Sequence, residues 1–190
     1  LMDLIGEPKM MGAMFARFTD LTIATVQHMM DLGCKPDAVW SIEDMGGTYT
    51  TLFSPKVFEE LLLPCHKRLG KFLHENGIYF FMHSCGYIEP LIPGLAEAGL
   101  DVLQAIQANT GMDVRKLKPE FGSKLTFFGN ISVQSFKNGP AAIEAELREK
   151  IPVAMADGGY IYHSDHSIPP EVSLKTYLHT MAVLDEISTY

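Results

Sequence analysis

Residues 76–86 read NGIYFFMHSCG, and this stretch decides the fold. Asn76-Gly77 interrupts the helical pattern before it, and residues 78–82 form an unbroken apolar run. A short run of this kind, bounded by turn residues, is typical of a strand that is buried on both faces, as the strands of parallel sheets are. We therefore predict a strand over residues 78–82 and a parallel sheet around it.

Strands and helices alternate on both sides of this stretch. Ser54-Pro55 pairs an N-cap residue with a first-turn proline, and Gly33 stands where the C′ residue of a helix needs φ > 0. The other predicted strands cover residues 38–42, 101–104, 125–128 and 160–162. The predicted helices cover residues 11–32, 54–74, 87–98, 112–118, 140–156 and 171–187. Because a helix follows every strand and no hairpin signal occurs, the sequence predicts an α/β protein with a parallel sheet.

A parallel sheet of this kind is either doubly wound or a barrel, and two features favour the barrel. The chain contains no G-x-G-x-x-G fingerprint and no Walker A sequence. Polar residues instead follow each predicted strand, and in a (β/α)8 TIM barrel all strands end on the one face where the chemistry takes place. These polar positions are Glu43-Asp44, residues 83–86, Gln104 with Gln107, Gly129-Asn130 and residues 163–166.

The size of the chain allows only part of a barrel. A complete eight-unit barrel takes about 250 residues, whereas the βα units predicted here already occupy 190. We predict a C-terminal segment of about five units that lacks roughly the first three. The alternative is a small open α/β domain with exposed parallel edges. A barrel segment is expected to be marginally stable alone or to complete itself by association, for example as a homo-oligomer.

The composition is that of a packed soluble domain. Apolar residues make up 47% and charged residues 20%, and the formal net charge is −8. This acidity, with no run of Lys or Arg, argues against a nucleic-acid partner. No apolar stretch reaches the roughly 18–20 residues of a membrane span, and the first residues, LMDL, lack the basic start of a secretory signal. The three cysteines, Cys34, Cys65 and Cys85, do not form a disulfide framework, so we expect a cytoplasmic protein.

His83 and Cys85 are the sharpest chemical signal in the chain. They stand two residues apart at the end of a predicted strand, so their side chains project to the same side. An imidazole and a thiolate so placed suit Zn²⁺. His166 after the last strand can converge on them as a third ligand, which leaves the fourth position open for a substrate. The alternative is that Cys85 is a small buried hydrophobe and His83 a hydrogen-bonded residue of the barrel.

Three carboxylates near the same face are candidate catalytic residues. Asp165 could orient either neighbouring histidine, or residues 162–170 could simply lead into the last helix. Glu43 and Asp44 could bind a cationic or hydroxyl group, or they could cap the turn after their strand.

Amides and further histidines complete the set. Asn130 could bind a ligand or hold its own turn. The histidines within predicted helices are expected to lie at the surface or to pack inside the fold. The candidate substrate-binding residues are Gln104, Asn130 and His163. The helical histidines are His28, His66, His74 and His179.

Five stretches carry a family resemblance: YFFMHSCG at residues 79–86, GLAEAGLDVL at 94–103, FGNI at 128–131, GGYI at 158–161 and IPPE at 168–171. Together they resemble the uroporphyrinogen decarboxylase (URO-D) superfamily over nearly the whole chain. The resemblance implies that residues 1–190 are the C-terminal part of a single barrel domain of that superfamily.

Two branches of the superfamily imply two activities. Zinc-dependent methyltransferases move a methyl group from a methylated corrinoid protein to a thiol such as coenzyme M. Their His-x-Cys-Gly pattern matches His83 and Cys85, and their late cysteine corresponds to His166. The other branch, the uroporphyrinogen III decarboxylases of porphyrin biosynthesis, uses no metal, and its arginines belong to the part that this chain lacks.

We favour the methyltransferase, with zinc as its cofactor and a corrinoid protein as its partner. The small-molecule substrate is then a thiol, or a tetrapyrrole if the decarboxylase is correct. A barrel that binds a metabolite without catalysis is the third alternative.

Overall fold

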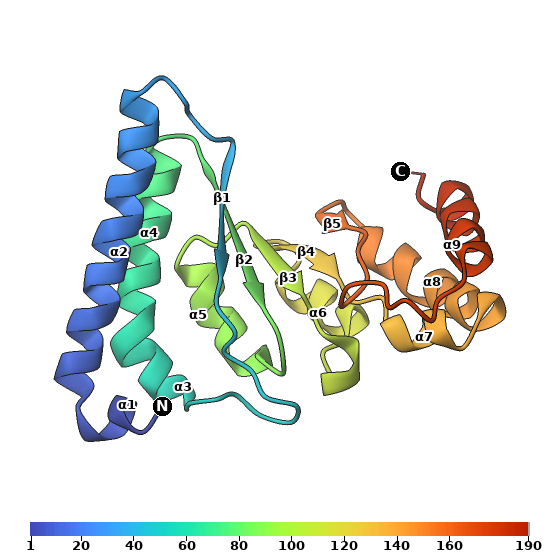
Figure 1. Ribbon diagram of the computed structural model, residues 1–190, viewed down its shortest axis with the longest axis horizontal. Coiled ribbons are helices and arrows are strands. Elements are labelled where there is room, and N and C mark those ends of the chain that lie inside the picture. The colour runs from blue at the N-terminus through green and yellow to red at the C-terminus, as the bar shows by residue number, and fades with distance from the viewer. Residues whose placement is uncertain (190) are drawn as a thin grey trace.

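The computed structural model describes residues 1–189 and shows a curved sheet of five parallel strands (Figure 1). The strands are β1 (Ala38–Ile42), β2 (Tyr79–Ser84), β3 (Val102–Ala105), β4 (Thr126–Gly129) and β5 (Tyr160–Ile161). They are hydrogen-bonded in sequence order, β1-β2-β3-β4-β5. A doubly wound sheet reverses its strand order part-way, whereas a barrel adds each new strand on the same side. The order therefore confirms the predicted α/β barrel architecture, present here as an open segment.

Helical segments connect the strands, with α2 and α4 side by side at one end of the molecule and α8 and α9 packed together at the other (Figure 1). The segments are α1 (Asp3–Gly6), α2 (Pro8–Asp31), α3 (Pro55–Val57), η1 (Phe58–Leu62), α4 (Leu63–Glu75), η2 (Glu89–Leu91), α5 (Ile92–Glu97), η3 (Ala108–Thr110), α6 (Val114–Phe121), α7 (Val133–Lys137), α8 (Pro140–Met155) and α9 (Leu174–Ile187). Within residues 1–189, no helix combines the length and the apolar character that crossing a membrane requires.

Local capping signals locate several helix ends correctly. Gly33 has φ +82° directly after the C-cap of α2, and the side chain of Ser54 accepts a hydrogen bond from the first turn of α3 at 3.2 Å. The predicted start of the last helix at residue 171 is wrong. The helix begins at Leu174, because the hydroxyl of Ser173 caps it by accepting an amide hydrogen bond at 3.1 Å.

The predicted helix over residues 54–74 contains one irregular turn. Residues Phe58–Leu62 form a π-helical turn, η1, in which the amide of Leu63 donates to the carbonyl of Phe58, five residues earlier. Such a turn adds one residue, and one residue corresponds to about 100° of rotation about the helix axis. The π turn therefore changes the rotation of α4 relative to α3.

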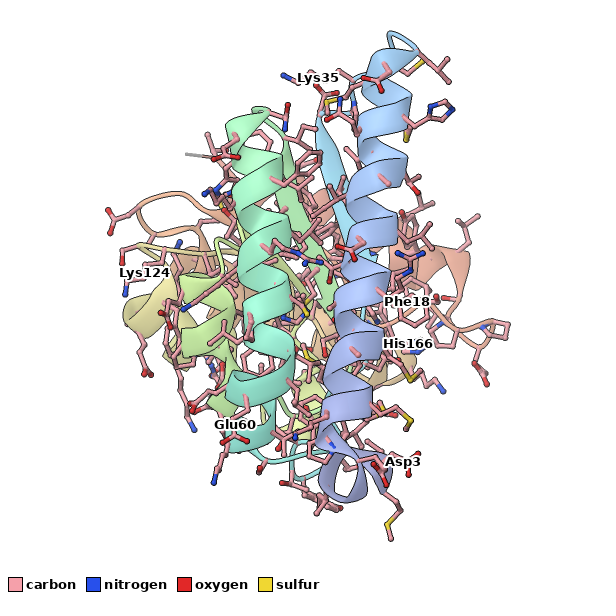
Figure 2. All side chains as sticks on the ribbon, turned by 90° about the vertical axis from the view of Figure 1, so that its left-hand side faces the viewer. Asp3, Phe18, Lys35, Glu60, Lys124 and His166 are labelled. Carbon is pink, nitrogen blue, oxygen red and sulfur yellow. The ribbon has the colours of Figure 1, made fainter. Side chains whose placement is uncertain are left out.

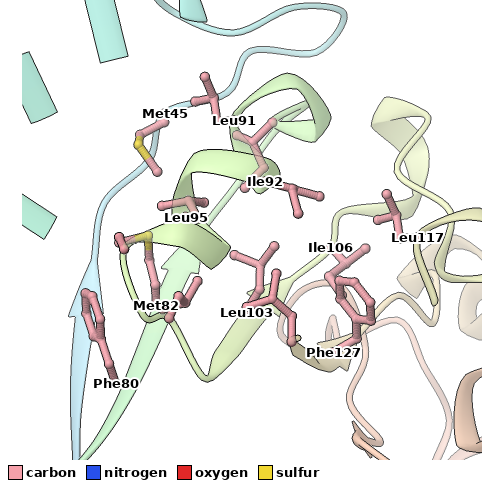
Figure 3. Close-up of a cluster of buried hydrophobic side chains, with 14 of the residues drawn as sticks. Met45, Phe80, Met82, Leu91, Ile92, Leu95, Leu103, Ile106, Leu117 and Phe127 are labelled. Carbon is pink, nitrogen blue, oxygen red and sulfur yellow. The ribbon is translucent and has the colours of Figure 1, made fainter. Parts of the chain in front are cut away.

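One face of the sheet packs against the helices and forms the main core. Phe80 and Met82 of β2, Leu103 of β3 and Phe127 of β4 have no exposed surface. Figure 3 shows them against the apolar side chains of η2 and α5, such as Leu95. These strand residues occupy alternate positions, as expected where one face of a strand meets a helical layer.

The other face of the sheet is concave and only partly buried, which corrects the prediction that residues 78–82 are buried on both faces. On this face Tyr79 is 62% exposed. The ring centroids of Trp40 on β1 and Phe128 on β4 lie 5.7 Å apart. Two strands lie between them, and in a flat sheet this spacing puts the two backbones about 14 Å apart. The sheet is therefore strongly curved, and the side chains of its concave face converge as they do inside a barrel.

β1 forms one edge of the five-stranded sheet and leaves apolar side chains uncovered. Ile42 is 76% exposed and Trp40 is 50% exposed. Beside them Phe18 of α2 is 64% exposed, and Figure 2 shows it on the side of α2 that points away from α4. This edge is the surface that further strands and helices cover in a closed barrel.

Candidate metal centre

The loops that follow β1 and β2 run side by side at the carboxyl end of the sheet. The register pairs Ile42 with His83, so two residues further along Asp44 stands beside Cys85. The amide of Cys85 donates to Asp44 Oδ1 at 2.9 Å, and the amide of Gly46 donates to the carbonyl of Cys85 at 3.2 Å. These bonds hold the two loops together on the face where barrel enzymes carry their active sites.

Two glycines allow the loops to approach this closely. A Cβ atom on Gly46 would lie 2.6 Å from the backbone carbonyl carbon of Gly86, and a Cβ atom on Gly86 would in turn overlap the backbone of Gly46. Gly86 also has φ +85°, a conformation that other residues rarely adopt. Both positions therefore require glycine.

Three side chains within residues 1–189 form a cluster of potential metal ligands: Asp44, His83 and Cys85. Their ligand atoms all lie within 4.8 Å of one another. His83 Nε2 is 3.2 Å from Cys85 Sγ and 3.4 Å from Asp44 Oδ1. The prediction that His83 and Cys85 project to the same side is confirmed, and Asp44 supplies a third donor.

Gln104 determines which ring nitrogen of His83 faces the cluster. The side-chain oxygen of Gln104, which is 7% exposed, accepts a hydrogen bond from His83 Nδ1. A proton on Nδ1 leaves the lone pair of Nε2 directed at Cys85 and Asp44. Metal-binding histidines have this arrangement, because their second nitrogen usually donates to a carbonyl or carboxylate oxygen. Gln104, predicted to bind a substrate, thus lies behind a potential ligand; its role in substrate binding stays a prediction.

The surroundings of Cys85 favour a cation. Burial raises the pKa of the Cys85 thiol, and the negative charges of Asp44 and Asp165 raise it further. The thiolate is the form that binds metals, and a divalent cation among the ligands stabilises that form. The negative charges of Asp44 and Asp165 oppose a free thiolate at Cys85, and the same charges attract a cation that would stabilise this thiolate.

The donor set fits zinc. Zn²⁺ binds nitrogen, sulfur and carboxylate oxygen at about 2.0–2.3 Å, so tetrahedral ligands stand about 3.3–3.6 Å apart. The separations of His83 Nε2 from Cys85 Sγ and from Asp44 Oδ1, 3.2 and 3.4 Å, lie close to this range. The side chain of Asp44 is 58% exposed, so the centre is open to solvent. Three protein donors leave one position of a tetrahedral site free for a substrate.

His166, the predicted third ligand, is not a member of this cluster. Its side chain is exposed, and its carbonyl accepts a hydrogen bond from the Ser164 hydroxyl at 2.7 Å. The physical reason lies in the topology, since β1 adjoins β2 whereas residue 166 follows β5 at the other edge of the sheet. The geometry gives the third position to Asp44; a contact between His166 and the ion stays a prediction.

Glu43 faces the helices instead of the metal cluster. Its carboxylate accepts a hydrogen bond from the Ser41 hydroxyl and pairs with His66 Nε2 at 2.8 Å. Burial opposes ionisation of Glu43, but His66 and Ser41 together outweigh it and lower the pKa of this carboxyl. The three residues line a cavity of about 430 Å³ among α2, β1 and α4. The catalytic role of Glu43 stays a prediction.

Asp165 is 3% exposed and connects two loops. Its carboxylate oxygens accept the amides of Ala108 at 3.1 Å and Val133 at 2.9 Å. Burial raises the pKa of Asp165, although these two amides act in the opposite direction. These contacts tie the segment to the loops after β3 and β4; a role in orienting a histidine and a catalytic role both stay predictions.

Asn130 is fully buried in the turn after β4. Its Nδ2 donates to the carbonyls of Ile106 and Met112, both at 2.8 Å, and its Oδ1 accepts the amide of Val114 at 3.0 Å. These bonds give Asn130 a structural role, in which it joins its turn to the segment between β3 and α6. Substrate binding by Asn130 stays a prediction.

His163 lies over the concave face of the sheet. Its ring packs edge-on against Phe128 with centroids 5.1 Å apart, and Phe128 in turn contacts Trp40. The position agrees with a residue that faces a substrate inside the barrel, although binding by His163 stays a prediction.

His66 has one of the two roles predicted for it, since it is 6% exposed and its ring packs against that of Phe58. Its bond with Glu43 was not predicted. The helical period contained the signal, since residue 66 shares the buried side of α4 with Leu69 and Leu73. A polar residue on such a side indicates a buried partner.

Comparisons with known proteins place the chain in a family. A family model described as uroporphyrinogen decarboxylase (URO-D) matches residues 1–187. The uroporphyrinogen decarboxylase of Salinispora tropica is 23% identical over 185 residues, which are 97% of this chain and 47% of that protein. The solved structure of a methyltransferase from Methanosarcina mazei is similar with a TM-score of 0.62 at 20% identity, covering 90% of this chain and 48% of the other. The chain therefore spans about half the length of either relative. Because the family match extends over nearly all its residues, the chain belongs to the uroporphyrinogen decarboxylase family.

Proposed function

We propose that this chain is the metal-binding part of a zinc-dependent methyltransferase, which moves a methyl group from a methylated corrinoid protein to a thiol. The observation that carries the proposal is the cluster of Asp44, His83 and Cys85 at the carboxyl ends of β1 and β2. Nitrogen, sulfur and oxygen donors with one position left free are typical of catalytic zinc sites. Membership of the URO-D family and the fold shared with a methyltransferase agree with the proposal.

Two hydrogen bonds within the chain hold the potential ligands in place. Gln104 keeps the lone pair of His83 Nε2 directed at the cluster, and the amide of Cys85 fixes the carboxylate of Asp44. When bound, zinc supplies a positive charge that lowers the pKa of a substrate thiol. The overall transfer forms a carbon–sulfur bond and breaks a carbon–cobalt bond. Both electrons of the broken bond stay on the corrinoid, and the thiol proton passes to solvent.

The exposed side of the cluster is where both substrates must arrive. Asp44 is exposed, while His83 and Cys85 are half-buried. A small thiol can therefore reach the centre from the open face of the sheet. The corrinoid protein would dock over the strand ends on the same side.

Metal content tests this proposal. Purified without added zinc, the chain is expected to carry about one zinc ion per molecule. Cys85→Ala is expected to lose the ion, because two donors remain. Cys34→Ala is the matched control, since Cys34 is an exposed cysteine outside the cluster. A zinc content near zero in the wild type, or equal contents in the two variants, would contradict the proposal.

A second candidate is the decarboxylation of uroporphyrinogen III, favoured by the relative from Salinispora tropica. The resemblance implies that this reaction needs no metal. Release of carbon dioxide from uroporphyrinogen that persists after dialysis against a chelator would support it over methyl transfer.

A further inference from the structure

We infer that His66 is a positioning residue for the metal centre: through Glu43 it holds Asp44 where Asp44 can bind the ion. The inference rests on the metal site of the proposed function. His66 itself is outside the ligand cluster, on the helix-covered side of β1. Metal affinity would thus depend on a residue of α4 that contacts no ligand atom.

Polar contacts run from α4 to the loop after β1. His66 Nε2 lies 2.8 Å from one carboxylate oxygen of Glu43, and the hydroxyl of Ser41 donates to the other. The side chain of His66 is 7% exposed and that of Glu43 is 31% exposed. Hydrogen bonds to a charged group with restricted solvent access are stronger than exposed ones. The Glu43 carboxylate is therefore fixed between β1 and α4.

Fixing Glu43 restrains Asp44, because a single peptide joins them. The amide of Glu43 donates to the carbonyl of His83 at 2.9 Å, so the backbone here continues the pairing of β1 with β2. Successive side chains of an extended segment point to opposite faces. Anchoring Glu43 on the helix side therefore directs Asp44 towards His83 and Cys85.

The π turn η1 lies directly before the part of α4 that carries His66, and its extra residue offsets the residues of α4 by about 100° from those of α3. The turn also contributes Phe58, whose ring packs against that of His66 with centroids 5.7 Å apart. Backbone and packing together hold the imidazole at Glu43.

A packing role alone does not explain a histidine at this position. Within residues 1–189, His66 Nδ1 is buried and has no hydrogen-bond partner. A buried polar atom without a partner destabilises a fold relative to an apolar group of similar size. The bond between His66 Nε2 and Glu43 explains why this buried position carries a histidine instead of an apolar residue.

Cobalt(II) titration of the full chain tests the inference, because the absorption of bound Co²⁺ reports affinity and thiolate ligation. We expect His66→Ala to weaken Co²⁺ binding about tenfold, in the range seen when groups behind metal ligands are removed. His66→Gln should restore most of the affinity, since its amide can still donate to Glu43. The matched control is His74→Ala, which removes another imidazole of α4 and its contact with Asp101 at 2.9 Å. Its affinity should equal that of the wild type.

Each result decides a different claim. Wild-type affinity in folded His66→Ala overturns the inference and leaves the metal site standing. If His66→Ala does not fold, Glu43→Leu decides instead, since it keeps the size of the side chain but cannot bind His66. If Glu43→Leu binds Co²⁺ about tenfold more weakly than the wild type, the inference is supported. If Glu43→Leu binds Co²⁺ as tightly as the wild type, the inference is overturned. Absence of Co²⁺ binding by the wild type overturns the proposed metal site and the inference with it.

Discussion

The three potential ligands are held to different degrees. His83 is fixed by the buried Gln104 behind it, and Cys85 is fixed by backbone bonds to the neighbouring loop. Asp44 is the most exposed of the three, and its carboxylate is oriented by the amide of Cys85. The exposed ligand thus depends most on its neighbours, which is why the anchoring of Glu43 matters for the centre.

Replacing Gln104 is expected to weaken metal binding. Gln104→Ala removes the acceptor of His83 Nδ1 and should reduce the affinity for Zn²⁺ about 10–100-fold, whereas Gln104→Glu keeps an acceptor and should stay close to the wild type. Competition with a chromophoric chelator measures both. Gln134→Ala, at an exposed position of α7, is the control. Wild-type affinity in Gln104→Ala would show that the orientation of His83 does not need this bond.

At the scale of elements, the site exists because two loops lie unusually close together. Gly46→Ala places a Cβ atom 2.6 Å from the backbone of the opposite loop. We expect the free energy of unfolding to fall by roughly 1–3 kcal/mol and zinc binding to weaken, because the loops must separate. Urea unfolding and a zinc titration measure the two effects. Gly6→Ala is the control, since a Cβ atom there meets nothing within 4 Å; equal stability of the two variants would be the contrary result.

A capping residue at the start of α6 makes a pH-dependent contribution to the stability of the fold. Asp113 caps this helix, and its hydrogen bonds with Arg115 lower the pKa of Asp113. An acid whose pKa is lowered by folding stabilises the fold above its unfolded pKa, about 3.9, and loses that effect as the pH falls through its folded value. Asp113→Ala should therefore be less stable than the wild type by about 1 kcal/mol at pH 7, and the difference should shrink near pH 3. Urea unfolding at both pH values checks this; an unchanged difference at pH 3 would contradict it.

The sequence predicts the elements of this fold better than their details. Apolar runs and the turn residues that bound them locate all five strands, because both are local features of the sequence. The π turn is not predictable in this way, since its residues look like those of an ordinary helix and only the hydrogen-bond pattern differs. Asp44 could be named as a site residue, but its contact with Cys85 follows from the register of β1 on β2, which a single sequence does not determine.

At the scale of the whole molecule, the chain is an open barrel segment with α2 and β1 at one end and α9 at the other (Figure 1). The metal cluster lies on the first two strands, close to the exposed edge formed by β1. Aromatic side chains from β1 and β4 meet on the concave face, so the curvature is present in the segment itself. The loops after β1 and β2 thus supply the three potential ligands of the cluster found within residues 1–189.

The exposed edge is expected to drive self-association of the 190-residue chain. Ile42→Lys and Phe18→Lys place charges on the apolar edge and should shift the chain towards the monomer without a large loss of stability. Sedimentation velocity over a range of concentrations measures this. Leu178→Lys on α9 is the control, because Leu178 is also exposed but lies at the other end of the molecule. A wild-type chain that is a stable monomer at all concentrations would count against the expectation.

An ion bound between two adjacent loops is the feature on which the proposed function depends. X-ray diffraction from zinc-loaded crystals, collected on both sides of the zinc absorption edge, tests this directly. We predict one anomalous peak bonded to His83 Nε2, Cys85 Sγ and a carboxylate oxygen of Asp44 at about 2.0–2.3 Å. A map without a peak at this position, or with the zinc bound elsewhere while Cys85 remains a free thiol, would contradict it.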